Sequence, residues 1–194
     1  MILIPFFGSE RRPVFSVMGL ILLVLAIATV RNTPGLPWIS GLIALPALCL
    51  EVWGLLDSSA EAARISADGL LAGFYFYVGY ALIAYVFADH WVTKDELFAV
   101  GAAFTVFAWA FAYVYLLVQQ VWPGSFQSQS PDEILTFHEL LYMSVACFTS
   151  VGLSDVAPVL PHARSVVMVE QLGGVLYVAM VISRLVALTA MRRL

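Results

Sequence analysis

A short polar passage near the C-terminus carries the residues most suited to chemistry. Residues 149–155 read Thr-Ser-Val-Gly-Leu-Ser-Asp and lie between two long apolar stretches. A bilayer offers no water to backbone amides, so non-helical chain at membrane depth is tolerated only inside protein or beside a wet pore. Such a loop can present a row of backbone carbonyl oxygens to a cation. We therefore expect this passage to replace the water shell of an ion.

The composition places this loop in a membrane protein. Of 194 residues, 62% are hydrophobic and 11% are charged, whereas soluble domains have roughly 45–50% apolar and about 25% charged residues. The net charge of −4 includes no basic stripe, which argues against a nucleic-acid partner. The partners that we expect are membrane lipid and monovalent cations, with no cofactor.

Hydropathy predicts an all-α membrane protein with about five transmembrane helices. The predicted spans are Val14–Val30, Pro37–Leu56, Gly69–Ala88, Leu97–Val121 and Ser165–Ala190. The stretch Glu133–Phe148 is too short to cross the bilayer. We interpret it as a re-entrant pore helix, followed by the polar loop and then by the last span.

The chain divides into two predicted regions and has a predicted orientation. Residues 1–95 hold three spans, and residues 96–194 form a pore domain of outer helix, pore helix, filter and inner helix. Arg192-Arg193 after the last span predict a cytoplasmic C-terminus, and counting back through five spans puts the N-terminus outside. Arg11-Arg12 oppose that count, so a missing initial span, with residues 2–7 as its stub, remains an alternative.

Residues 149–164 resemble the pore loop of potassium channels. The family pattern Thr-Thr-Val-Gly-Tyr-Gly-Asp-Ile-x-Pro corresponds to Thr-Ser-Val-Gly-Leu-Ser-Asp-Val-Ala-Pro at 149–158, and Ala163-Arg164 follow as in prokaryotic members. Upstream, residues 141–144 resemble the pore-helix run of the family. Downstream, the resemblance to the inner helix of small prokaryotic channels passes through Glu170, Gly173-Gly174, Tyr177 and residues 183–186.

The resemblance implies a selectivity filter in which backbone carbonyls, together with the Ser150 hydroxyl, bind K⁺. The ion-binding residues that it implies are Ser150, Val151, Gly152, Leu153 and Ser154. Asp155 would form a charged ring at the outer mouth, although a surface turn cap is the alternative. One chain supplies one loop, so the resemblance implies a homotetramer in the inner (plasma) membrane.

The resemblance also implies residues that support the filter or move the inner helix. Thr149 and Glu170 would support the filter, and Glu170 would accept hydrogen bonds from the pore loop. A buried carboxylate satisfied by its own neighbours is the alternative. Gly173 and Gly174 would form a gating hinge, or would simply permit close helix packing.

Two departures from the family pattern bear on ion choice. Ser154 stands where the family has its second glycine, and Leu153 where it has an aromatic residue. A left-handed conformation at Ser154 would cost roughly 1–2 kcal/mol; otherwise the loop relaxes and loses its outer carbonyl ring. We expect a potassium channel with reduced discrimination. The alternative is a non-conducting, channel-like subunit whose filter is altered at Ser154.

Two other function classes, an enzyme and a transporter, have less support in the sequence than a channel. The run Gly152-Leu153-Ser154 superficially resembles the serine motif of rhomboid proteases, which need a histidine on a later span. The only histidine after Ser154 is His162, in a loop, so we expect no enzyme. The spans show no internal repeat of the kind that secondary transporters carry, and no metal-ligand spacing links the histidines. K⁺ at the filter is the only metal that we expect.

Overall fold

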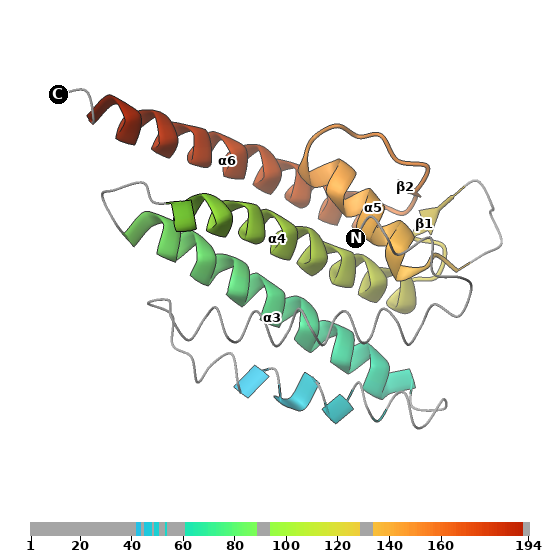
Figure 1. Ribbon diagram of the computed structural model, residues 1–194. Helices are drawn as coiled ribbons and strands as arrows, with labels where there is room; N and C mark the ends of the chain where they lie inside the picture. The colour runs from blue at the N-terminus through green and yellow to red at the C-terminus, as the bar shows by residue number, and fades with distance from the viewer. Residues whose placement is uncertain are drawn as a thin grey trace, which may run out of the picture.

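The computed structural model describes residues 42–43, 45–47, 49–50, 53, 61–88, 94–128 and 134–191. The long helices of this part are α3 (Glu61–Ala88), α4 (Lys94–Val121) and α6 (Pro161–Met191). A short helix, α5 (Phe137–Phe148), and two short strands, β1 (Phe126–Gln127) and β2 (Ala157–Pro158), complete it. Figure 1 shows α4 between α3 and α6, with α5 and both strands gathered at one end.

The described helices confirm the last three predicted spans. Segments long and apolar enough to cross a membrane are Ala62–Phe87, Phe98–Val121 and Pro161–Arg184. The predicted span Val14–Val30 lies outside the described residues. Of Pro37–Leu56, the structure describes residues 42–43, 45–47, 49–50 and 53, which are helical. The five-span architecture as a whole stays a prediction.

The helices begin at residues that hydropathy does not detect. Helix α3 starts at Glu61 rather than Gly69, because its first turns are polar but still helical. Helix α6 starts at Pro161 rather than Ser165, since proline is preset for the first helical position and lacks only an N–H that has no partner there. Apolar runs therefore mark only part of these two helices and not their full length.

Helix α5 begins at Phe137, four residues into the predicted stretch Glu133–Phe148, because a capping box fixes its start. The Thr136 hydroxyl accepts the Glu139 N–H at 3.4 Å, and the Glu139 carboxylate accepts the Thr136 N–H at 2.7 Å. These reciprocal bonds satisfy N–H groups that the first helical turn leaves free. The 12 residues of α5 span about 18 Å at 1.5 Å per residue, well short of a bilayer core.

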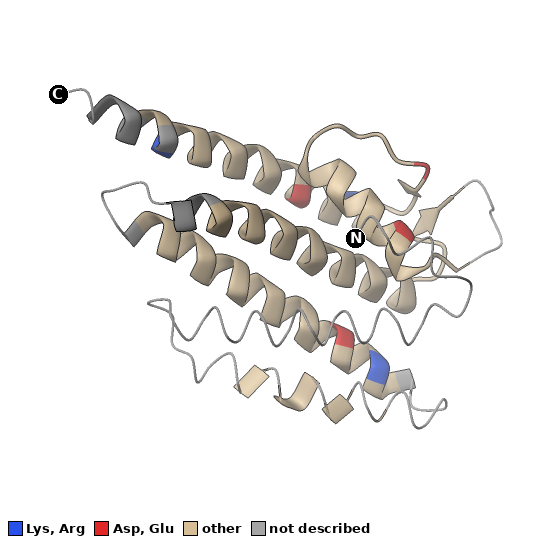
Figure 2. Cartoon of the chain, in the orientation of Figure 1, with Lys and Arg blue, Asp and Glu red and all other residues tan. Residues whose placement is uncertain are grey.

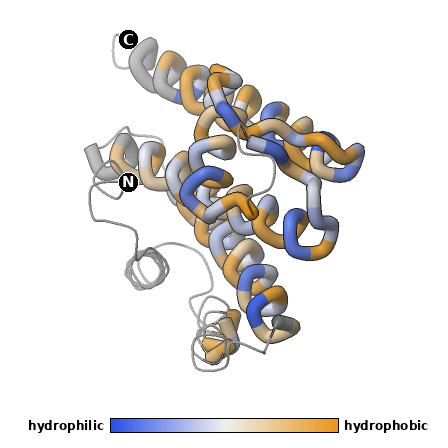
Figure 3. Tube along the Cα trace, turned by 90° about the vertical axis from the view of Figure 1, so that its right-hand side faces the viewer, coloured by the Kyte–Doolittle hydropathy of each residue, from blue (hydrophilic) through white to orange (hydrophobic). Residues whose placement is uncertain are grey.

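Aromatic side chains form the contact between α3 and α4. Tyr75 stacks on Tyr113 with ring centroids 5.6 Å apart, and Phe76 meets Phe111 edge-on at 5.0 Å. Gly79 lets the Phe107 ring approach so closely that a Cβ there would lie 2.7 Å from it. Figure 3 shows that hydrophobic residues line the described helices. This aromatic packing holds α3 against α4.

Helix α6 leaves most of its apolar surface uncovered within one chain. Only 22% of its most apolar window is buried, against 50% for α3 and 44% for α4. The exposed large hydrophobic residues of α6 are Met168, Val169, Leu172, Val175, Leu176, Val178, Met180, Ile182 and Val186. In a membrane protein such a surface contacts lipid or other copies of the chain.

Candidate functional site

The polar loop begins as a continuation of the C-terminal cap of α5. The Thr149 N–H donates to the Val145 carbonyl, the Ser150 N–H to Cys147 and the Gly152 N–H to Ala146, each at 3.0 Å. Hydrogen bonds of this kind satisfy carbonyls that have no partner at a helix end. They also fix the first half of the loop relative to α5.

Left-handed backbone occurs at two alternating positions in this loop. Ser150 has φ of 59° and Gly152 has φ of 68°; among the described residues no other non-glycine residue has positive φ. Glycine adopts this conformation without steric cost, whereas for serine it costs roughly 1–2 kcal/mol. The conformational strain therefore lies at Ser150 and not at Ser154, where the sequence left a strained and a relaxed loop open.

Ser154 avoids the left-handed conformation by closing a turn around Leu153. Its N–H donates to the Gly152 carbonyl at 3.1 Å, and its hydroxyl oxygen accepts the Val156 N–H at 3.1 Å. Serine side chains commonly make such local bonds to the backbone. Of the two sequence-based alternatives, the backbone of Ser154 matches the relaxed one, and the loss of an outer carbonyl ring stays a prediction. The Gly152 carbonyl is thus already hydrogen-bonded within the chain.

The outer part of the loop is exposed in the single chain. Val151 is 69% exposed and Leu153 is 73% exposed, and Asp155 also lies at the surface. Thr149 instead directs its hydroxyl at α5, where it donates to the Val145 carbonyl at 2.8 Å. The loop is therefore anchored at its start and open along its length.

A two-stranded ribbon anchors the far end of the loop. Strand β2 pairs antiparallel with β1, with Phe126 opposite Pro158, and the Val159 N–H donates to the Ser125 carbonyl at 2.8 Å. The sequence did not predict this pairing, because strands of two residues have no detectable periodicity. It ties the exit of the loop to the segment after α4.

His162 joins the same anchor at the start of α6. Its ring lies against Trp122 with centroids 4.4 Å apart, and its Nε2 is 3.2 Å from the Ser125 hydroxyl. The structure thus places His162 in packing against the segment after α4. In the part of the chain that the structure describes, no cluster of three or more His, Cys, Asp or Glu could hold a metal ion.

Glu170 is the one acidic residue of α6 (Figure 2), and it is completely buried. The Tyr115 hydroxyl of α4 donates to Oε2, and Oε1 lies 2.5 Å from the Ser144 hydroxyl of α5. We expected Glu170 to accept hydrogen bonds from the pore loop, but its two partners, Tyr115 and Ser144, both lie on helices. Glu170 therefore joins α6 to α4 and to α5.

Tyr115 and Gln119 are supporting residues that sequence analysis missed. The Gln119 amide donates to the Leu135 carbonyl at 3.0 Å and accepts the Leu135 N–H at 3.2 Å, which fixes the approach to α5. A phenol hydroxyl and an amide in an apolar span were the available signal, because buried polar groups need partners. Nothing in the sequence indicated which partners these would be.

The two adjacent glycines of α6 have different surroundings. A Cβ on Gly174 would lie 2.0 Å from the Phe148 carbonyl oxygen, whereas one on Gly173 would meet nothing within 4 Å. Gly174 thus permits close packing of α6 on the end of α5. Helix α6 runs unbroken through both glycines, and the hinge role of Gly173 and Gly174 stays a prediction.

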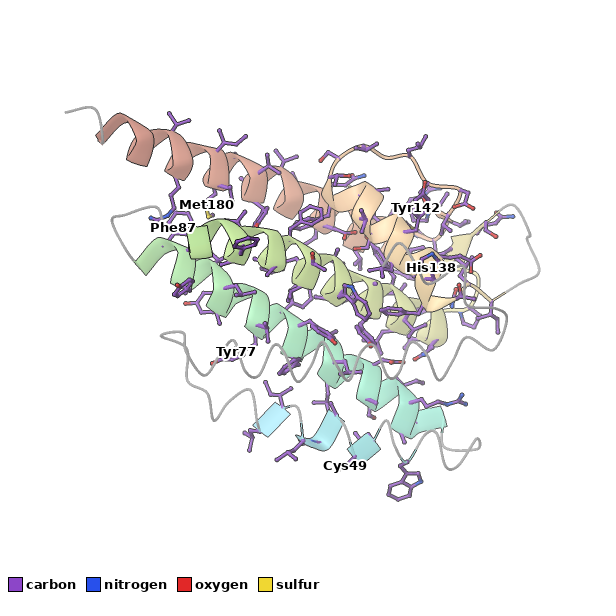
Figure 4. The ribbon with its side chains drawn as sticks, in the orientation of Figure 1. Cys49, Tyr77, Phe87, His138, Tyr142 and Met180 are labelled. Carbon is purple, nitrogen blue, oxygen red and sulfur yellow. The ribbon has the colours of Figure 1, made fainter. Side chains whose placement is uncertain are left out.

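Helix α6 also contacts α3, near the C-terminal ends of the two helices. The Arg184 guanidinium of α6 lies over the Phe87 ring of α3, 4.9 Å from its centroid. Figure 4 shows Phe87 near the end of α3. Helix α3 therefore contacts α6 through this pair, near the C-terminal end of each helix.

Comparison with known proteins identifies the C-terminal region. A family model described as an ion channel matches residues 101–190, which include α4, α5, the polar loop and α6. No curated protein and no solved structure matches the chain. Residues 101–190 are therefore an ion channel domain in a membrane protein, which confirms the predicted resemblance to pore-loop channels.

Proposed function

We propose that this ion channel conducts potassium through a homotetrameric pore whose narrowest part is lined by the loop after α5. The observation that carries this proposal is the alternation of left-handed backbone at Ser150 and Gly152 with a residue of negative φ between them. Alternating signs of φ along a short segment can turn successive backbone carbonyls to the same side of that segment. A row of such oxygens replaces the water shell of K⁺.

The length of α5 supports a re-entrant path. A helix of 12 residues is far shorter than the roughly 20 residues needed to cross. The chain therefore enters with α5, turns at Thr149 and returns through β2 to the start of α6. Non-helical backbone at that depth is tolerated where it lines a water-filled cavity. The filter loop meets this condition only if other copies of the chain surround it.

The uncovered surface of α6 supports a tetramer. One chain provides a single loop, and a closed ring of carbonyls requires about four. The loop and the apolar side of α6 are both exposed in one chain, so a ring of copies would cover them together. In this assembly the carbonyls of Ser150, Val151 and Leu153 face the ion, and Asp155 concentrates cations at the outer mouth. The membrane is the plasma membrane of a prokaryote, with the C-terminus inside.

Rubidium uptake into liposomes that contain the purified protein tests the function. We expect uptake well above that of empty vesicles. Gly152→Ala should abolish it, because alanine resists the positive φ of the filter strip. Gly124→Ala is the matched control, since Gly124 also has positive φ, 80°, and open space around its Cβ position. Uptake equal to that of empty vesicles, or equal loss in both variants, would count against the proposal.

A second candidate is a channel-like subunit that does not conduct. The observation in its favour is the hydrogen bond from the Ser154 N–H to the Gly152 carbonyl, which holds one filter oxygen inside the chain. A carbonyl has two lone pairs, so this bond alone does not prevent ion binding. Restoring glycine at Ser154 separates the two candidates.

A further inference from the structure

The hydrogen bonds around Ser144 require more protons than its hydroxyl provides. The Ser144 Oγ lies 2.8 Å from the Ala108 carbonyl oxygen and 2.5 Å from Glu170 Oε1. A carbonyl and an ionised carboxylate only accept, and a serine hydroxyl has one hydrogen to donate. If Glu170 were ionised, one of these two close oxygen pairs would have no hydrogen between its atoms.

The missing proton can come only from Glu170. The Tyr115 hydroxyl donates to Oε2, so this oxygen acts as the acceptor and Oε1 is left to carry the proton. Each oxygen pair then has one hydrogen: Oε1 donates to the Ser144 hydroxyl, Ser144 donates to the Ala108 carbonyl, and Tyr115 donates to Oε2. Every polar atom of the set has a partner, and no charge is left in a site where Glu170 and Ser144 are both 0% exposed.

The surroundings of Glu170 contain no described charge to balance a carboxylate. The titratable groups that face it are Tyr115 from α4 and Cys147 from α5, and both are neutral in their usual forms. An isolated buried carboxylate is far more costly than a neutral, hydrogen-bonded acid. The donor count and the surroundings thus favour the same protonation state.

We propose that Glu170 is a neutral acid that donates a hydrogen bond to Ser144 and thereby positions the pore helix. Its bond to Ser144 orients the Ser144 hydroxyl toward the Ala108 carbonyl, which joins α5 to α4. Its Oε2 accepts the Tyr115 hydroxyl, which joins α6 to α4. The loop begins one turn beyond Ser144, so its position depends on this set. Glu170 acts through α5 and does not touch the ion.

Infrared spectroscopy of the purified channel tests the protonation state directly. At neutral pH we expect the carbonyl stretch of a protonated carboxyl group, lost in Glu170→Gln and kept in Glu139→Gln. Glu139 is the matched control because its Oε2 accepts the Thr136 N–H and hydroxyl, each at 2.7 Å, as an ionised carboxylate does. Absence of the band from the unaltered protein, or its survival in Glu170→Gln, would overturn the inference.

Side-chain substitutions test the positioning role. Glutamine can donate to Ser144 and accept from Tyr115, so Glu170→Gln should keep rubidium flux within about twofold, whereas Glu170→Leu should lose about tenfold or more. Equal losses in both variants would contradict the inference. The flux measurement rests on the proposed function, whereas the infrared spectrum does not. An unaltered protein that shows the carboxyl band but no rubidium flux would therefore refute the proposed function and leave the protonation of Glu170 standing.

Discussion

Gly174 of the inner helix faces the carbonyl group of Phe148, the last residue of α5. The contact is so close that a Cβ at Gly174 would lie 2.0 Å from the carbonyl oxygen and 2.8 Å from the carbonyl carbon. Both obstructing atoms are backbone, so no side-chain rotation can make room. Helix α6 therefore packs on the backbone at the end of α5, directly before the polar loop.

Adding one methyl group at either glycine should have very different effects. We expect Gly174→Ala to lower the free energy of unfolding by about 1–3 kcal/mol or more, because overpacking moves backbone, and to reduce ion flux. Gly173→Ala has open space and should leave stability unchanged or slightly higher. Thermal unfolding in detergent and liposome flux measure both effects.

The same pair of variants tests the predicted hinge. If α6 bends at these glycines, Gly173→Ala will change open probability in single-channel recordings while stability is preserved. Unaltered gating in that variant would remove Gly173 from the hinge. A stable Gly174→Ala protein with normal flux would contradict the packing argument.

Removing the Tyr115 hydroxyl should leave a buried acceptor without a donor. We expect Tyr115→Phe to destabilise the protein by about 1–3 kcal/mol, the cost of an unsatisfied buried polar group. Tyr80→Phe, at a residue that is 68% exposed, is the control and should have no effect. Equal unfolding temperatures for the two variants would show that the bond to Glu170 contributes nothing.

Glycine at position 154 should change ion selectivity more than total flux. It permits the positive φ that Ser154 avoids, so we expect Ser154→Gly to lower sodium permeability relative to potassium, with rubidium flux similar to that of the unaltered protein. Ser154→Ala keeps the N–H and loses only the hydroxyl acceptor, and it serves as the control. Reversal potentials under mixed-ion conditions report the ratio. A large gain of rubidium flux in Ser154→Gly would instead favour the non-conducting subunit.

Neutralising Asp155 should weaken conduction in a salt-dependent way. An exposed charge raises the local cation concentration most at low ionic strength, because the screening length shrinks from about 30 Å at 0.01 M to 3 Å at 1 M. We expect Asp155→Asn to reduce single-channel conductance at low salt and to match the unaltered channel at high salt. A reduction that is independent of salt would mean that Asp155 shapes the loop, as a turn cap would.

The ion channel resemblance could be predicted from the sequence because its signals are local. Long apolar runs predict the spans, and the motif at residues 149–158 carries the resemblance that the family match confirms over residues 101–190. These features depend on residues near one another along the chain or on a recognisable motif.

The features that sequence analysis missed are contacts between distant residues. Tyr115 meets Glu170 across 55 positions and Gln119 meets Leu135 across 16, and no periodicity encodes such pairs. The left-handed conformation lies at Ser150 and not at Ser154, and no residue pattern in the sequence distinguishes these two serines.

The most direct test of the account is the density along the symmetry axis of the assembled protein, imaged by cryo-electron microscopy in potassium. We predict a fourfold axis with ion density at the level of Val151 to Leu153, bounded by backbone carbonyls. A loop turned away from the axis, or an assembly without a central ring at that level, would contradict the central claim that this strip binds the permeating ion.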